Sequence, residues 1–291
     1  MTSLSPALLD LMSKVVDGEA SYDDLLRHIQ ATQSDQNSLA MEQIGRLAGA
    51  TVDLGRQSRC GFGEVIFGEG KSAELITRII QTQLDAGQSA LVTRIDSGVA
   101  FQVRQSFAFA CHNPVARTLR ITPTQISGSQ PLTPQQLETT FHAAVVTAGS
   151  TDTPVAEEAI ETLNWMGVPW QRFDDIGVAG PQRLAAVVPL LRFASVVVVV
   201  AGMEGALPAV VAGHLAVPVF AVPTSIGYGA NLGGLTPLMG MLSTCAASVA
   251  VVNIDGGFKG GYMAGMVVRQ LQQYSAGRQY SEGQPGSEVG A

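Results

Sequence analysis

The 291-residue chain has few cysteines, histidines and charged side chains, and each shortage argues against a class of protein. Its three cysteines, Cys60, Cys111 and Cys245, show no CxxC spacing and predict neither a disulfide framework nor a structural zinc site. The four histidines are not spaced as ligands, so we expect no protein-bound transition metal. Charged residues make up 14% of the chain, with a net charge of -7. Because no basic stripe is present to neutralise phosphates, we expect no nucleic-acid partner.

Long apolar runs are also missing. The longest run, residues 194–201, is too short to cross a bilayer. The N-terminus lacks the charged and apolar regions of a signal peptide, so we expect a cytoplasmic protein with no membrane partner. Hydrophobic residues nevertheless reach 46%. A chain with so few charges is expected to cover part of its surface in a homo-oligomer.

Residue patterns divide the chain into four segments. Residues 1–48 carry apolar positions at helical spacing and predict a helical N-terminal segment. Residues 49–140 predict a small α/β domain, and residues 141–274 alternate strand and helix patterns. Residues 275–291 are polar and glycine-rich, and we expect them to form a disordered tail.

Residue patterns in the two N-terminal segments also predict individual helices and strands. Ser21 is a plausible helix cap for a helix over residues 22–29, and a further helix is expected over residues 39–47. In the small α/β domain we expect a helix over residues 73–86. Strands are expected at residues 64–67, 90–93 and 99–101.

The C-terminal segment gives the clearest prediction of fold. Its central run, residues 196–200, consists of valine alone, which is typical of a strand buried on both faces of a parallel sheet. Five strand–helix units in succession predict an α/β domain with a doubly wound parallel sheet. The expected strands are 143–148, 168–173, 196–200, 217–222 and 249–254, and the expected helices are 153–166, 179–193, 206–215, 235–245 and 262–274.

Small polar motifs follow these strands, at the edge where open α/β sheets bind ligands. The run Gly149, Ser150, Thr151 and Asp152 offers hydroxyls and helix N–H groups that suit a phosphate, although it equally fits an ordinary helix-capping turn. Glu204 follows the all-valine strand, where partial desolvation would raise its pKa and suit acid–base chemistry. A helix N-terminal glutamate that interacts with the dipole is an equally good interpretation.

Two further features are ambiguous on residue chemistry alone. Cys245 ends a predicted helix, and a lone cysteine is more often a small buried hydrophobic residue than a nucleophile. Arg56, Arg59 and Lys71 share one segment with two glycine turns and could clamp a phosphate or carboxylate. A solvated loop surface is the commoner explanation for such a basic cluster.

Taken in order, four segments closely resemble the LarB family: residues 201–208, 222–229, 241–245 and 251–255. The resemblance covers about residues 50–272, and in the N-terminal part it is carried by Asp53, Arg56, Arg59, Gly61, Phe62, Glu64 and Lys71. Members of this family are carboxylase/hydrolases that begin synthesis of the nickel-pincer nucleotide cofactor of lactate racemase. The resemblance therefore implies a PurE-like, flavodoxin-like three-layer catalytic domain.

The resemblance also implies a reaction. Nicotinic acid adenine dinucleotide and CO2 or bicarbonate would give pyridinium-3,5-biscarboxylic acid mononucleotide and AMP, with Mg2+ at the substrate phosphates. The implied catalytic residues are Cys245 as nucleophile, Glu204 for proton transfer, and Ser150 and Asp152 at the carboxylate or CO2. The implied substrate-binding residues are Gly149, Thr151, Gly202, Gly205, Thr224, Ser225, Gly227, Tyr228, Arg56, Arg59 and Lys71.

PurE-type domains are octameric, so the resemblance implies a homo-oligomer, with an octamer expected. Small residues on two predicted helices, Ala209, Ala212, Gly213 and Gly265, would let helices of different subunits approach closely.

The chain departs from the family pattern at Gln182, where a histidine is usual. Two alternatives therefore stay open. A PurE-type aminoimidazole ribonucleotide carboxylase or mutase relies on a histidine that is absent here, and Cys245 also disfavours it. The second alternative is a catalytically inactive nucleotide-binding module, which stays open because Gln182 replaces the usual histidine.

Overall fold

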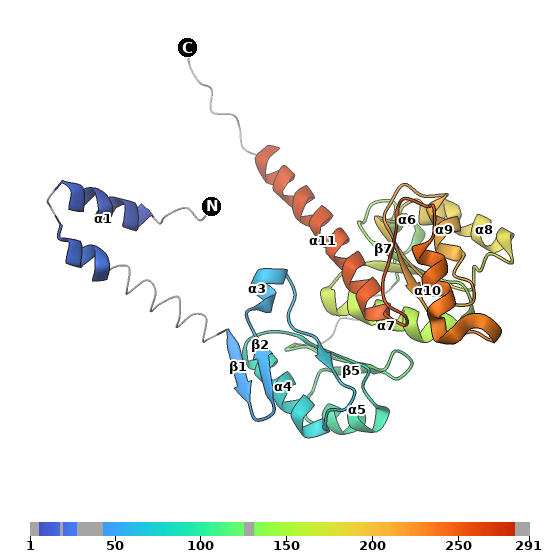
Figure 1. The fold of residues 1–291 in the computed structure, drawn as a ribbon, viewed down its shortest axis with the longest axis horizontal. Coiled ribbons are helices and arrows are strands. Elements are labelled where there is room, and N and C mark those ends of the chain that lie inside the picture. The colour runs from blue at the N-terminus through green and yellow to red at the C-terminus, as the bar shows by residue number, and fades with distance from the viewer. Residues whose placement is uncertain (1–5, 18–19, 28–42, 125–130, 283–291) are drawn as a thin grey trace, which may run out of the picture. The chain divides into compact units, whose positions relative to one another are not determined.

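The computed structural model describes residues 6–17, 20–27, 43–124 and 131–282 (Figure 1). The chain forms two compact units, Met1–Glu64 and Val65–Ala291. Among the described residues, no helix combines the length and apolar composition that crossing a bilayer requires.

The first unit begins with helices. Helix α1 spans Pro6–Val16, and residues 22–27 form a second helix. Ser21 caps the second helix as expected, since its Oγ accepts a hydrogen bond from the backbone N–H of Asp24 at 3.2 Å. A short helix, α3, follows later in this unit at Arg56–Cys60.

A β-hairpin replaces part of the helix that was expected over residues 39–47. Strand β1, Ile44–Leu47, pairs antiparallel with β2, Ala50–Asp53. Leu47 lies opposite Ala50, so the turn between the strands has only two residues. Its second residue, Gly49, has φ +88, a conformation that glycine adopts without a steric penalty. The helix prediction is therefore wrong for residues 44–47, while residues 39–42 lie outside the described part.

The second unit contains a small mixed sheet in the order β3-β4-β6-β5. Strand β3 is parallel to β4, and the other two pairings are antiparallel. The bounds are β3 Ile66–Phe67, β4 Ala90–Thr93, β5 Ala110–Asn113 and β6 Thr118–Ile121, with helix α4 at Ala73–Asp85. The helix and the first two strands confirm the expected elements to within two residues.

The strand expected at residues 99–101 is wrong, because these residues belong to helix α5, Ser97–Arg104. The Asp96 carboxylate starts this helix by accepting hydrogen bonds from the N–H groups of Gly98 and Val99, at 2.8 and 3.3 Å. Ala100 and Val103 then form its buried face. A local cap therefore outweighs the β preference of the short apolar run.

A five-stranded parallel sheet confirms the doubly wound fold class. Its order is β8-β7-β9-β10-β11, and every pairing is parallel. All six residues of β9 are buried, as the valine run predicted. The chain reverses its direction of winding between β7 and β9, and such a switch point is where doubly wound sheets bind ligands. The bounds are β7 Ala143–Thr147, β8 Trp170–Phe173, β9 Val196–Ala201, β10 Val219–Pro223 and β11 Val249–Val251.

Helices cover both faces of this sheet (Figure 1). One face packs against α8, Pro181–Leu191, α9, Leu207–Ala212, and α10, Leu235–Leu242. The other face packs against α7, Thr153–Met166, and α11, Gly257–Glu282. A further short helix, α6, spans Pro134–Leu137.

Helix α11 packs closely on α7 of the same chain. A Cβ on Gly265 would lie 2.4 Å from Cε of Met166. Gly265 therefore permits an approach within the chain, and its expected role between subunits is wrong. The helix also continues to Glu282, so residues 275–282 are helical rather than part of a disordered tail, and residues 283–291 lie outside the described part.

Helix α7 also packs against the small sheet, where its carboxylates meet one arginine of β6 and one that directly follows β4. Glu161 lies 3.3 Å from Nε of Arg120, and both side chains are buried. Glu158 lies 2.9 Å from Nε of Arg94, the residue that follows β4. Removing one partner from such a buried pair leaves an uncompensated charge, which is strongly destabilising. These pairs therefore hold the small sheet beside the carboxyl ends of β7 and β10.

Candidate functional site

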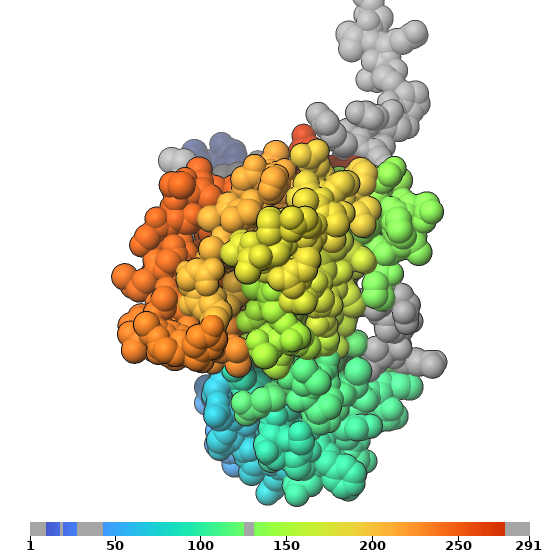
Figure 2. Space-filling model, turned by 90° about the vertical axis from the view of Figure 1, so that its right-hand side faces the viewer, coloured from blue at the N-terminus to red at the C-terminus, as the bar shows by residue number. Residues whose placement is uncertain are grey.

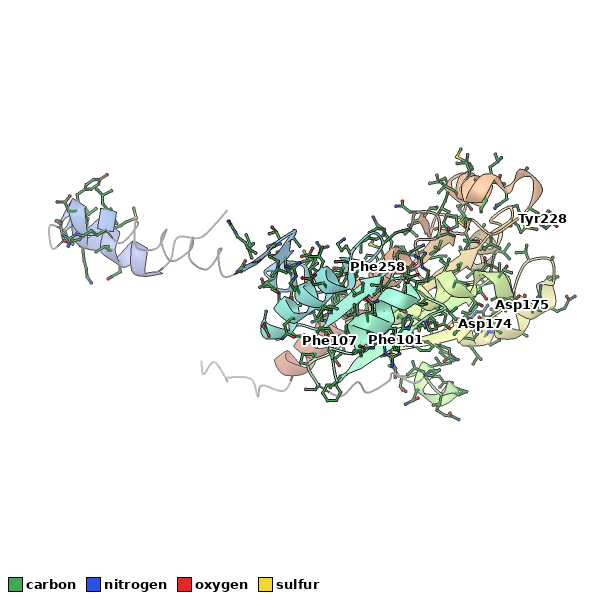
Figure 3. All side chains as sticks on the ribbon, turned by 90° about the horizontal axis from the view of Figure 1, so that it is seen from below. Phe101, Phe107, Asp174, Asp175, Tyr228 and Phe258 are labelled. Carbon is green, nitrogen blue, oxygen red and sulfur yellow. The ribbon has the colours of Figure 1, made fainter. Side chains whose placement is uncertain are left out.

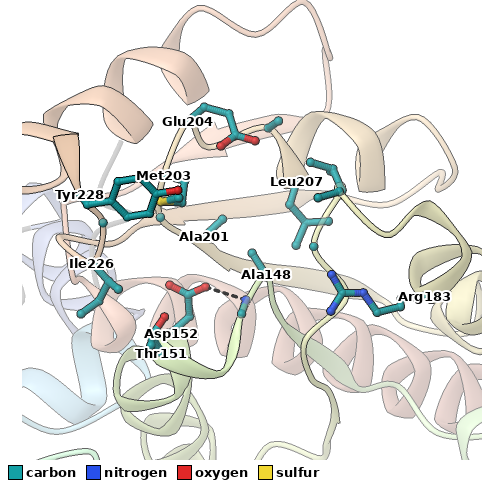
Figure 4. A pocket seen from close by; sticks show the side chains of 17 residues that line it. Ala148, Thr151, Asp152, Arg183, Ala201, Met203, Glu204, Leu207, Ile226 and Tyr228 are labelled. Atoms are coloured by element: carbon teal, nitrogen blue, oxygen red, sulfur yellow. Dashed lines mark hydrogen bonds between the residues drawn. The ribbon is translucent and has the colours of Figure 1, made fainter. Parts of the chain in front are cut away.

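A cavity of about 530 Å³ opens at the carboxyl ends of the parallel strands, at the switch point between β7 and β9 (Figure 4). The loops after β7, β8, β9 and β10 form its walls. Seven of the expected site residues line it together: Gly149, Thr151, Asp152, Gly202, Glu204, Gly227 and Tyr228. The residues that follow the predicted strands are therefore brought together in one cavity at the carboxyl edge of the sheet.

Asp152 is the best-fixed polar group of this cavity. It ends a short 3-10 turn, Ser150–Asp152, and is 3% exposed. Its Oδ1 accepts a hydrogen bond from the Thr224 hydroxyl at 2.8 Å, and its Oδ2 accepts one from the backbone N–H of Gly149 at 2.9 Å. Burial raises the pKa of Asp152 above its ordinary value, and these hydrogen bonds oppose the shift. The carboxylate thus ties the β7 loop to the β10 loop and can hold or release a proton.

Glu204 lies on a tight turn after β9. Gly202 is required there, since a Cβ at that position would lie 2.3 Å from the carbonyl oxygen of Ile226. Met203 and Gly205 have φ values of +55 and +71, which turn the chain sharply around Glu204. Figure 4 places the Glu204 and Asp152 carboxylates on opposite walls of the cavity. The Glu204 side chain is exposed, however, so the partial desolvation expected for it is absent in the single chain.

Arg183 lines the cavity and was not identified from the sequence as a site residue. It lies in the first turn of α8, and its guanidinium points into the cavity (Figure 4). Its Nη1 lies 2.8 Å from Oδ1 of Asp175, and about half of each side chain is exposed. The neighbouring Gln182 is exposed and does not line the cavity. Gln182, which replaces the histidine usual in the family, therefore lies beside the cavity wall rather than in it.

The loop after β10 supplies the fourth wall. Thr224 is fully buried and acts on the cavity only through its bond to Asp152. Ser225 donates its backbone N–H to Oδ1 of Asp255 at 2.8 Å and lines a neighbouring cavity. Tyr228 is 80% exposed and forms the rim, at the outer edge of this unit (Figure 3).

Cys245 is not brought to this cavity within one chain. It is exposed and lies in the loop between α10 and β11, which leads into the amino end of β11. In the same loop, the carbonyl of Ser248 accepts a hydrogen bond from the N–H of Val219, the first residue of β10. The cavity lies at the opposite, carboxyl edge of the sheet.

The remaining expected residues lie outside the cavity walls. Ser150 is exposed on the turn after β7, and Gly205 is buried under the turn that carries Glu204. Lys71 donates to the backbone oxygen of Phe67 at 2.7 Å and lines none of the described cavities. Arg56 and Arg59 belong to the first unit, where Arg59 is paired with Asp53 at 2.6 Å.

Metal chemistry can be judged from the donor groups. Within the described residues, no group of three or more His, Cys, Asp or Glu side chains is placed to hold a metal ion. Mg2+ usually accompanies phosphates through substrate oxygens, water and one or two carboxylates, and Asp152 and Glu204 are the carboxylates that line this cavity.

Comparisons with known proteins match two successive segments of the chain. Residues 42–123 match the family model of the LarB/PurE-like N-terminal domain, and residues 142–279 match that of AIR carboxylase. An uncharacterized protein of Methanocaldococcus jannaschii is 32% identical over 274 residues, which cover 91% of this chain and 98% of that protein.

Solved structures that resemble part of the chain include two from Treponema denticola. A variant of its PurE2 is 14% identical, with a TM-score of 0.36, over 49% of this chain and 96% of that one. Its PurE is 15% identical, with a TM-score of 0.35, over 48% of this chain and 94% of that one.

Proposed function

The chain belongs to the LarB family, and on that premise we propose that it is a nicotinic acid adenine dinucleotide carboxylase/hydrolase. Family membership supports a carboxylase-type enzyme. The finer proposal is that CO2 or bicarbonate is added to C5 of the pyridinium ring, and that the phosphoanhydride is hydrolysed to release AMP. The product would be pyridinium-3,5-biscarboxylic acid mononucleotide, the first intermediate of the nickel-pincer nucleotide cofactor.

One observation carries this proposal: the cavity at the switch point combines two carboxylates and an arginine around apolar walls. Its volume of about 530 Å³ falls in the range of sites for small organic ligands. Arg183 offers a partner for the nicotinate carboxylate, because a guanidinium binds a carboxylate with two parallel hydrogen bonds. Asp152 and Glu204 face that space from opposite sides, so one ring can lie between two groups that exchange protons.

In the proposed reaction, a thiolate adds to C4 of the pyridinium, and the ring becomes a dihydropyridine that is nucleophilic at C5. C5 then forms a bond to CO2, a base removes the C5 proton, and the C4–S bond breaks to regenerate the thiolate and the aromatic ring. Glu204 is the proposed base, and Cys245 is the proposed nucleophile. Water completes the separate hydrolysis that gives AMP.

Cys245 can take this role only in the cavity of another copy of the chain, because it lies at the amino edge of its own sheet. An apolar face beside it supports such a contact: Leu235, Met239 and Leu242 on α10 are 46%, 56% and 60% exposed. Their spacing of four and three residues places them on one side of the helix. Figure 2 shows the face formed by the yellow to orange segments, which include α8, α9 and α10. We therefore propose a homo-oligomer in which the thiol of one chain serves the cavity of its neighbour, and an octamer remains our expectation.

Magnesium fits this proposal only as a companion of the substrate phosphates. Asp255 is a carboxylate that lines two cavities beside the first, and it already accepts a hydrogen bond from the Ser225 N–H. When bound, the ion would neutralise phosphate charge and assist hydrolysis of the phosphoanhydride.

The test is incubation of the full chain with nicotinic acid adenine dinucleotide, 13C-labelled bicarbonate and magnesium, followed by mass spectrometry. We expect AMP and a dicarboxylated mononucleotide that carries one 13C label. A parallel incubation with aminoimidazole ribonucleotide tests the alternative carboxylase. Label in that product alone, or in neither product, would overturn the proposal.

A further inference from the structure

One buried asparagine holds the loop that follows β10. Asn231 is 5% exposed, and its Nδ2 donates a hydrogen bond to the backbone oxygen of Ser225 at 2.8 Å. A Cβ on Gly227 would lie 2.6 Å from Cγ of Asn231, so the amide packs directly against the backbone of Gly227. The Asn231 side chain therefore contacts the loop at two points, one on each side of Ile226.

The Asn231 amide does not satisfy all of its own hydrogen-bonding groups. Its Oδ1 is buried and has no hydrogen-bond partner among the described residues. A buried acceptor without a partner costs stability, and such a group in a folded protein calls for a specific explanation. Packing alone does not require an amide at this position, because an apolar side chain of similar shape would fill the space without this cost.

The backbone after Asn231 is bent sharply. Leu232, Gly233 and Gly234 have φ values of +49, +66 and +95. A left-handed conformation is unfavourable for leucine, and such strain persists mostly where the surrounding structure fixes the backbone. A Cβ on Gly234 would lie 2.9 Å from the carbonyl oxygen of Thr224. The turn after Asn231 therefore packs closely against the start of the loop that Asn231 holds.

The middle of this loop contacts the turn that carries Glu204. The carbonyl of Ile226 accepts a hydrogen bond from the N–H of Met203 at 3.5 Å. The same carbonyl oxygen would lie 2.3 Å from a Cβ on Gly202. Because Asn231 holds the residues on both sides of Ile226, it also fixes the carbonyl on which the Glu204 turn rests.

The start of the loop has anchors of its own. The Thr224 hydroxyl donates to Oδ1 of Asp152 at 2.8 Å, and the N–H of Ser225 donates to Oδ1 of Asp255, also at 2.8 Å. Neither bond involves Asn231. Loss of the Asn231 amide would therefore free the middle of the loop while Asp152 stays in place.

We propose that Asn231 is a positioning residue for carboxylation: it holds the Ile226 carbonyl, and through it the turn that places Glu204 across the cavity from Asp152. This inference rests on the proposed function, in which Glu204 removes the ring proton. Asn231 itself lines none of the described cavities and acts only through the loop. Its loss should therefore slow the step that moves the proton and leave binding of the dinucleotide largely unchanged.

The kinetic test compares kcat and KM of full-length variants. Asn231→Ala should lower kcat about 10- to 100-fold, the range expected when a catalytic group is misplaced by about 1 Å, and should leave KM within about twofold of the wild type. Asn164→Ala is the matched control. Oδ1 of Asn164 accepts a hydrogen bond from Nε1 of Trp170 at 2.7 Å, and Asn164 lines none of the described cavities. This control should lose stability but not kcat. Equal losses of kcat in the two variants, or a raised KM at unchanged kcat in Asn231→Ala, would overturn the inference.

Asn231→Asp separates the hydrogen bond from the shape of the side chain. A protonated carboxyl group can donate to the Ser225 oxygen, whereas an ionised one cannot, and burial favours the protonated form. The ratio of variant to wild-type kcat should therefore rise about tenfold as the pH falls from about 8 to about 5. Asp152, Glu204 and Asp255 titrate in both proteins, so the ratio removes their contribution. A ratio that stays at the level of Asn231→Ala at every pH would contradict the proposal.

Hydrogen exchange tests the positioning without any turnover. In the chain alone, the N–H of Met203 should exchange about tenfold faster in Asn231→Ala than in the wild type, the change expected for loss of one hydrogen bond. Peptides from β8 should exchange at the same rate in both proteins, because β8 is the strand at the far edge of the sheet. Unchanged exchange at Met203 would refute the positioning role even if the variant carboxylates more slowly. If exchange at Met203 rises but the wild type does not carboxylate its dinucleotide, the proposed function fails and the positioning role stands.

Discussion

Asp152 offers the sharpest test of how the cavity is built, because its charge and its hydrogen bonds can be removed separately. Its carboxylate is 3% exposed and accepts bonds from the Thr224 hydroxyl and the Gly149 N–H. Asp152→Ala leaves both donors without their partner. At about 1–3 kcal/mol for each unsatisfied buried group, and with partial relaxation, we predict a loss of about 2–4 kcal/mol in the free energy of unfolding.

Asp152→Asn should behave differently. The amide oxygen can accept the Gly149 N–H bond, and the amide nitrogen can donate to the Thr224 hydroxyl oxygen, so both contacts survive. Burial raises the pKa of Asp152 in the folded chain above its ordinary value of 3.8. At pH values between 3.8 and the raised pKa, the folded state binds more protons than the unfolded state, so the stability of the wild type falls as pH rises. Above the folded pKa this cost is fully present, and the asparagine variant lacks it.

We therefore predict that, at pH 7, the free energy of unfolding of Asp152→Asn is at most about 1 kcal/mol below that of the wild type, or exceeds it. The variant should also lack the fall in stability with rising pH that the raised pKa of Asp152 causes in the wild type. The assay is urea unfolding, monitored by tryptophan fluorescence. Trp165 lies on α7 and Trp170 on β8, in the domain that holds the cavity. Glu138→Gln, at an exposed carboxylate, is the control. If the asparagine variant is as unstable as the alanine variant, or keeps the wild-type pH slope, the account of a buried, hydrogen-bonded carboxylate is wrong.

Three further predictions concern the proposed chemistry. Cys245→Ala should abolish carboxylation with an unchanged melting curve, because the side chain is exposed; near wild-type turnover would exclude the covalent step. Glu204→Gln should lower the rate by about two to four orders of magnitude, as for loss of a general base, and a loss below tenfold would leave Glu204 a structural role. Light scattering at micromolar concentration should show a homo-oligomer. A mixture of Cys245→Ala chains and Glu204→Gln chains should regain activity, because each variant supplies the group that the other lacks. A monomer, or a mixture without recovered activity, would contradict a shared site.

The sequence predicted the elements whose pattern is repeated over several residues. The valine strand at residues 196–200 and the helix at residues 153–166 lie where expected, because burial on two faces or on one helical stripe is encoded in consecutive side chains. Short elements were harder to predict. The run at residues 99–101 has the side chains of a strand, but the Asp96 cap makes it helical. The hairpin at residues 44–53 depends on a single glycine turn.

The candidate site could be predicted where it follows a strand, and it was missed where it depends on tertiary contacts. Glu204 and Asp152 could be found because the carboxyl edge of a parallel sheet can be read from the strand order. The bond between Asp152 and Thr224 joins residues 72 positions apart, and Arg94 reaches Glu158 across 64 positions. No local pattern marks Arg94, since it acquires its partner Glu158 only in the folded chain.

In the proposed mechanism, the position of Cys245 links the chemistry to assembly of the chain into an oligomer. In a parallel sheet, a loop that precedes a strand and a loop that follows one lie at opposite edges, so Cys245 and the cavity cannot meet within one chain without unpairing β11. The thiol lies just beyond an exposed apolar face of α10, and the cavity rim carries Tyr228, which is 80% exposed. Water-exposed apolar surface of this kind is stabilised by burial against another molecule. A contact that buries α10 of one chain near Tyr228 of a second would bring thiol and ring together, and it would leave a dissociated chain folded but inactive.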